Sequence, residues 1–297
     1  MPPCTCCTRC TTSSPPSRAH QAATSALISA PGAASATSAT ACQSVTRIAS
    51  WDERDAILYA LAVGARADEL DLVFEERLRV LPTFALTLAQ WAPDALGSQG
   101  AFDVRTAVHG AQRLRVLAPL PPAGTLELRA RVGDVWDKGS AAVFDVVVEC
   151  DAFVATWALF APGCGGFGGD RGPSSPPRPD GAPQLTSEVA TAPNQAALYR
   201  LLGDRHHMHV DPGAAQAAGQ PRPFLHGLCT LAATTLALAR EAGVHPADLA
   251  ELDGRFSAPV FPGDRLGVAA WRDGPATAFE VTSGDRPVLS GGRVRFA

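Results

Sequence analysis

The chain of 297 residues contains 25 basic residues, of which only Lys138 is a lysine, and its positive charge therefore comes from scattered arginines. A net charge of −4 gives no sign of a nucleic-acid partner. No apolar run approaches the roughly 20 residues that a membrane-spanning helix needs. With 46% hydrophobic and 18% charged residues, the composition is typical of a soluble globular protein with no membrane partner.

Acidic residues are absent before Asp52, and the segment 1–46 is rich in Ser, Thr, Ala and Pro. This composition predicts a disordered low-complexity tail, or a targeting segment of the organellar transit type. It lacks the apolar stretch of a secretory signal, so we expect a cytoplasmic protein, or an organellar one if the tail is a transit peptide. Its C-x-C-C-x-x-C run lacks the second spaced pair that a zinc site requires, and we assign no metal there.

The remaining chain divides at a Gly/Pro-rich linker, residues 165–187, into segments 47–164 and 188–297. A helix is expected at 51–65 and strand-like sequence after Leu81-Pro82, with clear strands at 124–135 and 141–154. The second segment predicts a core helix at 225–239 and four strands, near 255–261, 264–271, 277–282 and 288–296.

Short matches between the two segments indicate an internal repeat. The sequence PLPP at 119–122 parallels PVFP at 259–262, and FDV at 144–146 parallels FEV at 279–281. Two copies of a helix laid across an antiparallel sheet would each cover the other's edge.

Four of the seven histidines lie between residues 199 and 230, at His206, His207, His209 and His226. Groups that titrate near neutral pH, placed directly before an apolar helix, favour an enzyme pocket. A metal site formed by the first three histidines with Asp204 and Asp211 is one interpretation. The adjacent pair His206-His207 cannot both point inward, however, and no distant ligand pair is evident.

Three other interpretations of the chemistry compete with the metal site. Nucleophilic hydrolysis lacks a G-x-S-x-G elbow, and Cys229 falls within the apolar run. A phosphate loop at 163–172 is followed by prolines where a binding helix should begin, which favours a flexible linker, although Arg171 remains a candidate phosphate contact. Acid–base work by Asp204 and His209 competes evenly with a helix cap at Asp204 beside a solvated histidine.

A family resemblance bears on that balance. The motif GDRHHMHVDP at 203–212, followed by GQPRPFLHGLCT at 219–230, resembles the signature of the type-2 (R-specific) enoyl-CoA hydratases within the MaoC-like dehydratase family. The resemblance covers about residues 50–297. It continues through YALAVGA (59–65), LPTFA (81–85), VHGAQ (108–112), DKG (137–139), GGFGGDRGP (165–173) and RFSAPVFPGDRL (255–266).

The resemblance implies an α+β double hot-dog fold, in which two antiparallel sheets each wrap a central helix, with the catalytic domain at 188–297. It implies reversible hydration of trans-2-enoyl-CoA to (3R)-3-hydroxyacyl-CoA, without a metal or other cofactor, and a homodimer as a further expectation. The motif assigns catalysis to Asp204, His209 and Gly227. Substrate contacts are expected from His206, Pro223, Phe224 and His226.

The chain departs from the family pattern at His206-His207-Met208, where the family usually has Asn-Pro-Leu. A histidine at 206 can still form hydrogen bonds, but it is bulkier than asparagine and can become charged. Two alternatives to the hydratase therefore stay open. One is a 3-hydroxyacyl thioester dehydratase acting in synthesis on a CoA or carrier-protein substrate. The other is a hot-dog protein that binds acyl-CoA without turnover.

Overall fold

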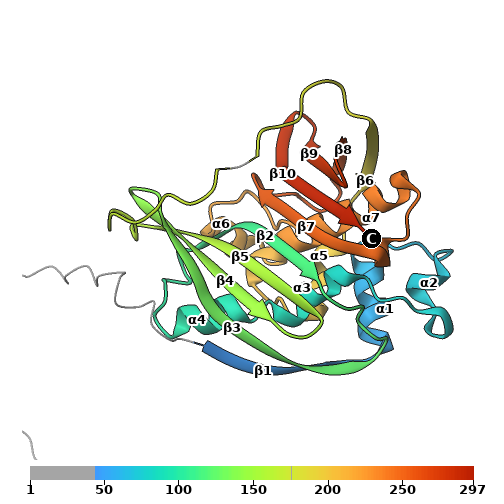
Figure 1. Ribbon diagram of the computed structural model, residues 1–297, viewed down its shortest axis with the longest axis horizontal. Coiled ribbons are helices and arrows are strands. Elements are labelled where there is room, and N and C mark those ends of the chain that lie inside the picture. The colour runs from blue at the N-terminus through green and yellow to red at the C-terminus, as the bar shows by residue number, and fades with distance from the viewer. Residues whose placement is uncertain (1–43, 175) are drawn as a thin grey trace, which may run out of the picture. The chain divides into compact units, whose positions relative to one another are not determined.

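The computed structural model describes residues 44–174 and 176–297, in which ten antiparallel strands pair into one continuous sheet (Figure 1). The strands are β1 (Ser44–Trp51), β2 (Val108–Val116), β3 (Gly124–Asp137), β4 (Ala141–Glu149), β5 (Phe153–Pro162), β6 (Leu185–Ala190), β7 (Leu249–Phe256), β8 (Arg265–Asp273), β9 (Ala276–Ser283) and β10 (Arg286–Phe296). The helices are α1 (Glu53–Ala62), α2 (Leu70–Val73), α3 (Ala85–Ala89), α4 (Ala92–Ser98), α5 (Gln195–Tyr199), α6 (Pro212–Ala217) and α7 (Gly227–Ala242). Short 3₁₀ turns are η1 (Glu75–Arg77), η2 (Pro82–Phe84), η3 (Arg200–Leu202), η4 (His207–His209) and η5 (Pro246–Asp248).

The sheet order confirms the internal repeat. From its two edges inward the strands run β1-β3-β4-β5-β2 and β6-β8-β9-β10-β7, which is the same order in both halves. The central strands β2 and β7 pair antiparallel from Ala111 opposite Arg255 to Arg115 opposite Glu251. The α+β double hot-dog class is therefore confirmed, with the two expected sheets joined edge to edge as one.

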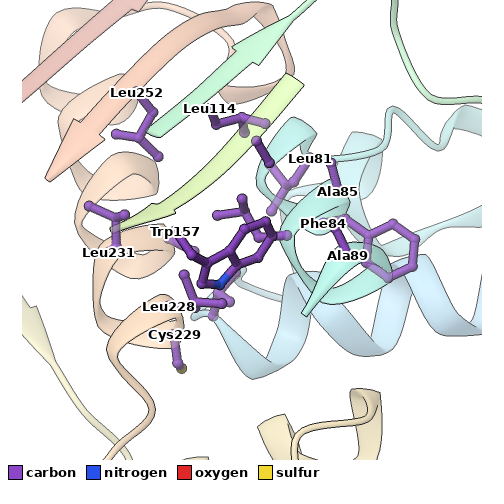
Figure 2. Close-up of a cluster of buried hydrophobic side chains, with 14 of the residues drawn as sticks. Leu81, Phe84, Ala85, Ala89, Leu114, Trp157, Leu228, Cys229, Leu231 and Leu252 are labelled. Carbon is purple, nitrogen blue, oxygen red and sulfur yellow. The ribbon is translucent and has the colours of Figure 1, made fainter. Parts of the chain in front are cut away.

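A single hydrophobic core lies between the sheet and the helices of both halves. Figure 2 shows Leu228 of α7 beside Trp157 of β5, with Leu231 on one side of that ring and Phe84 and Ala85 of the first half on the other. Helix α7 is buried from Leu228 to Ala239 because this stretch is apolar apart from three threonines, whose hydroxyls donate to backbone carbonyls four residues earlier. It ends at Gly243 in the left-handed conformation. Among the described residues, no helix is long and apolar enough to cross a membrane.

Several expected boundaries differ from the structure. Strand β1 begins at Ser44, inside the segment 1–46 expected to be a tail, and the remainder of that prediction, with its cysteine run, lies outside the described residues. The segment after Leu81-Pro82 is helical rather than strand-like, because Pro82 begins a 3₁₀ turn that leads into α3. Strand β7 ends at Phe256, so the strand expected at 255–261 was placed too late; residues 257–261 are not in a strand.

The Gly/Pro-rich segment wraps a buried carboxylate. Asp137 accepts hydrogen bonds from the N–H groups of Gly139, Gly166 and Gly168 at 2.8–2.9 Å. These amides are therefore occupied within the protein, and the phosphate-loop interpretation of 163–172 is wrong. The lysine ammonium of Lys138 donates to the carbonyl of Arg171, and strand β6 begins at Leu185, within the expected linker.

Candidate active site

The histidine-rich stretch forms a loop that joins α5 to α7 and is supported by the first half of the chain. Gly203 adopts a φ of 121°, a conformation that favours glycine, and a Cβ there would lie 2.7 Å from Nε2 of Gln90. Gln90, which follows α3, donates from that nitrogen to the Leu202 carbonyl at 2.9 Å. These two features fix the conformation of the backbone immediately before Asp204.

Asp204 is held by its neighbour two residues along the chain. Its Oδ1 accepts from Nδ1 of His206 at 2.6 Å and from the His206 backbone N–H at 3.2 Å. Burial alone would raise the pKa of this carboxyl, but the His206 hydrogen bond and the nearby histidines outweigh it and hold the pKa far below its usual range. Asp204 is therefore an anion at neutral pH. The expected helix cap at Asp204 is wrong, because the side chain that caps α6 is Asp211, through Gly213 N–H at 3.0 Å.

His209 and His226 stack beside this carboxylate. Their ring centroids are 3.7 Å apart with an interplanar angle of 28°. The Nδ1–H of His209 donates to the Phe224 carbonyl at 2.8 Å, which leaves Nε2 as an acceptor. Burial lowers the pKa of both histidines, that of His226 to about 3, so both rings are neutral near pH 7.

His226 points its Nε2–H at the Asp204 carbonyl, 3.3 Å away, and its buried Nδ1 has no partner among the described residues. Asp204, His209 and His226 each bring a ligand atom to within 4.8 Å of the others. An ion bound to an imidazole nitrogen lies close to the plane of that ring, and two stacked rings inclined by only 28° do not readily share such a point, which disfavours a shared metal ion. The metal interpretation that used His207 and Asp211 is wrong for a separate reason, because Asp211 caps α6 and His207 is exposed.

Gly227 is the first residue of α7, so its N–H has no acceptor within the helix and lies at the positive end of the helix dipole. A Cβ at this position would lie 2.9 Å from Cε1 of Phe256 on β7, so only glycine fits without movement of that ring. The helix start is fixed by Leu225, whose N–H donates to the Val260 carbonyl at 2.7 Å. Asp204, His209, His226 and Gly227 thus meet at one end of α7.

The other predicted substrate contacts lie around this centre. The Phe224 ring meets His209 edge to face at a centroid distance of 4.9 Å, and Pro223 is half-buried one residue earlier. His206 is more exposed than Asp204, and its Nε2 lies 3.7 Å from Oδ2 of Asp94 on α4. All the predicted residues therefore occupy one region.

Three nearby residues were not assigned to the site from the sequence. His109 on β2 meets the Phe256 ring at 4.7 Å, and desolvation lowers its pKa to about 4. Tyr199 places its ring 4.8 Å from that of His226. The third is Asp94. In the sequence, only the motif VHGAQ at 108–112 pointed to His109. No spacing pattern connects His109 with a loop about a hundred residues later in the chain.

An open groove of about 1090 Å³ reaches Asp204 and His206 from solvent. Its walls come from β1, the α3–α4 segment and the loop from Leu202 to Met208. Arg47, Arg205, His206 and His207 line it together with apolar residues such as Ile48 and Leu88. The groove is thus built mainly by the first half of the chain, whereas the site residues come from the second.

Two different family models match the two halves of the chain. Residues 174–291 match the MaoC like domain, and residues 50–156 match the MFE-2 hydratase 2 N-terminal domain. Two Mycobacterium tuberculosis proteins, named 3-hydroxyacyl-thioester dehydratase Y and Enoyl-CoA hydratase ChsH3, are each 39% identical. The alignments cover 83% and 82% of this chain and 93% and 92% of theirs.

Solved structures show the same architecture. A MaoC-like dehydratase from Phytophthora capsici superposes with a TM-score of 0.80 at 25% identity, covering 88% of this chain and 97% of its own. A Mycobacterium tuberculosis protein described as having a double hotdog fold superposes with a TM-score of 0.53 at 14% identity, over 85% and 94% of the two chains, which supports the fold alone. The chain belongs to the MaoC-like dehydratase family, with a first half of the MFE-2 hydratase 2 N-terminal type.

Proposed function

We propose that the protein is a hydro-lyase that reversibly hydrates trans-2-enoyl-CoA to (3R)-3-hydroxyacyl-CoA. The observation that carries the proposal is the meeting of an ionised carboxylate, Asp204, with a neutral imidazole, His209, at the N-terminus of α7. Hydration of an α,β-unsaturated thioester needs both elements, since a proton must move and negative charge develops on the thioester oxygen. The names of the two mycobacterial relatives support the same pair of opposite reactions.

Gly227, Asp204 and His209 have separate roles in this reaction. The Gly227 N–H donates to the thioester oxygen, where the dipole of α7 stabilises the developing enolate. Asp204 and the free Nε2 of His209 hold a water molecule whose oxygen bonds to Cβ while one of its protons passes to this pair. The pair then delivers a proton to Cα, so that both groups end in their starting protonation states and all atoms of water are in the product.

The direction of the reaction depends on substrate supply, because the same groups catalyse dehydration by the reverse steps. One relative is named a dehydratase, so the second candidate function of this site is dehydration of a 3-hydroxyacyl thioester in a synthetic reaction. A carrier-protein substrate would need a basic rim to meet its acidic surface. Comparison of turnover on a CoA thioester and on the same acyl group attached to a carrier protein distinguishes the two uses.

The test is hydration of crotonyl-CoA and of a longer enoyl-CoA, followed by loss of the enoyl thioester absorbance. Asp204→Asn and His209→Ala should each abolish measurable hydration, because removal of a positioned acid–base group costs about a hundredfold to ten-thousandfold in rate. His207→Asn is the matched control, since His207 is exposed in the same loop. Release of free CoA would instead indicate a thioesterase, and tight binding without turnover would indicate a binding protein. Full hydration by both site variants would refute the assignment.

A further inference from the structure

His206 occupies a position between two carboxylates that come from different halves of the chain. Its Nδ1 donates to Oδ1 of Asp204 at 2.6 Å, and its Nε2 lies 3.7 Å from Oδ2 of Asp94 on α4. The side chain lines the open groove and is about half exposed, so it can exchange protons with solvent. Both ring nitrogens therefore face an acceptor, an arrangement that suits the charged form of the ring.

The two contacts differ in what they require of the ring. A neutral ring with its proton on Nδ1 keeps the hydrogen bond to Asp204 but presents only a lone pair to Asp94. A charged ring makes both contacts. The hydrogen bond that orients Asp204 thus persists in both forms, whereas the charge beside Asp204 appears only when Nε2 is protonated.

We propose that His206 is a positioning residue that orients the Asp204 carboxylate through Nδ1 and weakens it as a base whenever Nε2 is protonated and paired with Asp94. The inference rests on the proposed function, because it concerns the base strength of the carboxylate assigned to catalysis. A positive charge next to a carboxylate stabilises its ionised form, and a more stable carboxylate removes a proton from water less readily.

The charged and titratable groups around His206 determine the pH range in which its ring is charged. Asp204 and Asp94 both favour the charged ring, and the hydrogen bond to Asp204 is the main reason that the pKa of His206 is raised above its usual value. Arg205 and His207 of the same loop and Arg47 of β1 line the same groove. His209 and His226 are neutral near pH 7, because burial lowers the pKa of each. The rise in kcat caused by loss of the His206 charge should therefore occur above about pH 6.5. The rise caused by deprotonation of His209 should occur at lower pH, so the two are separate in the pH–rate profile.

The experiment measures kcat and KM for crotonyl-CoA hydration between about pH 5.5 and 9. In the wild-type protein kcat should rise by on the order of three- to thirtyfold as His206 loses its charge, with little change in KM. His206→Asn places an N–H near the position of Nδ1 but cannot be charged, so this rise should be absent. Asp94→Asn should move the rise to lower pH, and His207→Asn should leave it in place.

A second measurement does not depend on turnover. NMR titration of the His206 ring should give a pKa above the ordinary histidine value, falling in Asp94→Asn and in Asp204→Asn. Identical pH profiles for wild type and His206→Asn, loss of all activity in a folded His206→Asn, or a His206 pKa at or below the ordinary value would each overturn the inference. Absence of hydration by the wild type at every pH would count against the proposed function, and the titration would still decide whether the two carboxylates hold a charged His206.

Discussion

The two halves of the sheet have the same strand order but carry different helices. The second half packs one helix of 16 residues, α7, whereas the first places the shorter α3 and α4 after β1 and α1. The long helix supplies the N-terminus at which Asp204, His209 and Gly227 meet. The segment of the short helices walls the groove that reaches Asp204 and contacts the loop 202–208 through Gln90 and Asp94. The proposed chemistry is thus assigned to the second copy of the repeat. The first copy walls the groove and contacts the loop that carries Asp204.

The largest expected effect tests whether the halves are one folding unit. Leu231 of α7 and Leu86 of α3 are both fully buried in the shared core. Replacement of either leucine by alanine should lower the free energy of unfolding by about 2–5 kcal/mol through lost burial and the cavity left behind. Urea unfolding followed by circular dichroism and by tryptophan fluorescence should give one coincident transition for each variant. Two separated transitions would show that the halves unfold independently.

The next effect concerns the start of α7, the long helix of the second half. Gly227→Ala should lower kcat about a hundredfold, because the added Cβ meets Phe256 and displaces the N–H assigned to the thioester oxygen. Gly213→Ala at the start of α6 is the matched control, since a Cβ there meets only Asp211 at an ordinary 3.6 Å. Adding Phe256→Leu to Gly227→Ala should restore part of the rate by making room. Equal loss in the double variant would argue against the steric explanation.

The sequence predicted the parts of this arrangement that are local. Helix α7, the loop with Asp204 and His209, and the repeated strands are encoded in continuous stretches, so apolar pattern and motif spacing could locate them. The helices after Pro82 were missed because their apolar residues also suit strands. The contacts of Asp94 with His206 and of His109 with Phe256 join residues more than a hundred positions apart. They depend on the pairing of β2 with β7, which no local pattern specifies.

A smaller effect tests the support that the first half gives to the catalytic loop. Gln90→Ala removes the hydrogen bond to the Leu202 carbonyl and should cost about 0.5–1.5 kcal/mol in stability. Because this bond sets the backbone directly before Asp204, kcat should fall several-fold as well, without a change in the thioester contacts that determine KM. Exposed Gln216, on α6, serves as the control in Gln216→Ala. A loss of stability with unchanged kcat would show that the loop keeps its geometry without the first half.

The smallest effect concerns an ion pair that ties the halves together at the far end of α7. Arg240 donates to both carboxylate oxygens of Glu69, from Nε at 2.7 Å and from Nη2 at 2.5 Å. Burial alone would raise the pKa of Glu69, but the hydrogen bonds and charge of Arg240, with help from Arg66, lower it. The pair therefore stabilises the fold above the unfolded-state pKa of Glu69, and this contribution is lost as the pH falls through the lower folded-state value.

Glu69→Gln should accordingly lower the free energy of unfolding by about 1 kcal/mol or less near pH 7, and the difference from wild type should shrink as the pH falls below about 4. Urea unfolding at a series of pH values measures this difference directly. Glu188→Gln is the matched control, because its pair with Arg265 joins β6 and β8 within the second half and is largely exposed. A penalty for Glu69→Gln that does not shrink with falling pH would assign the effect to packing of the side chain rather than to its charge.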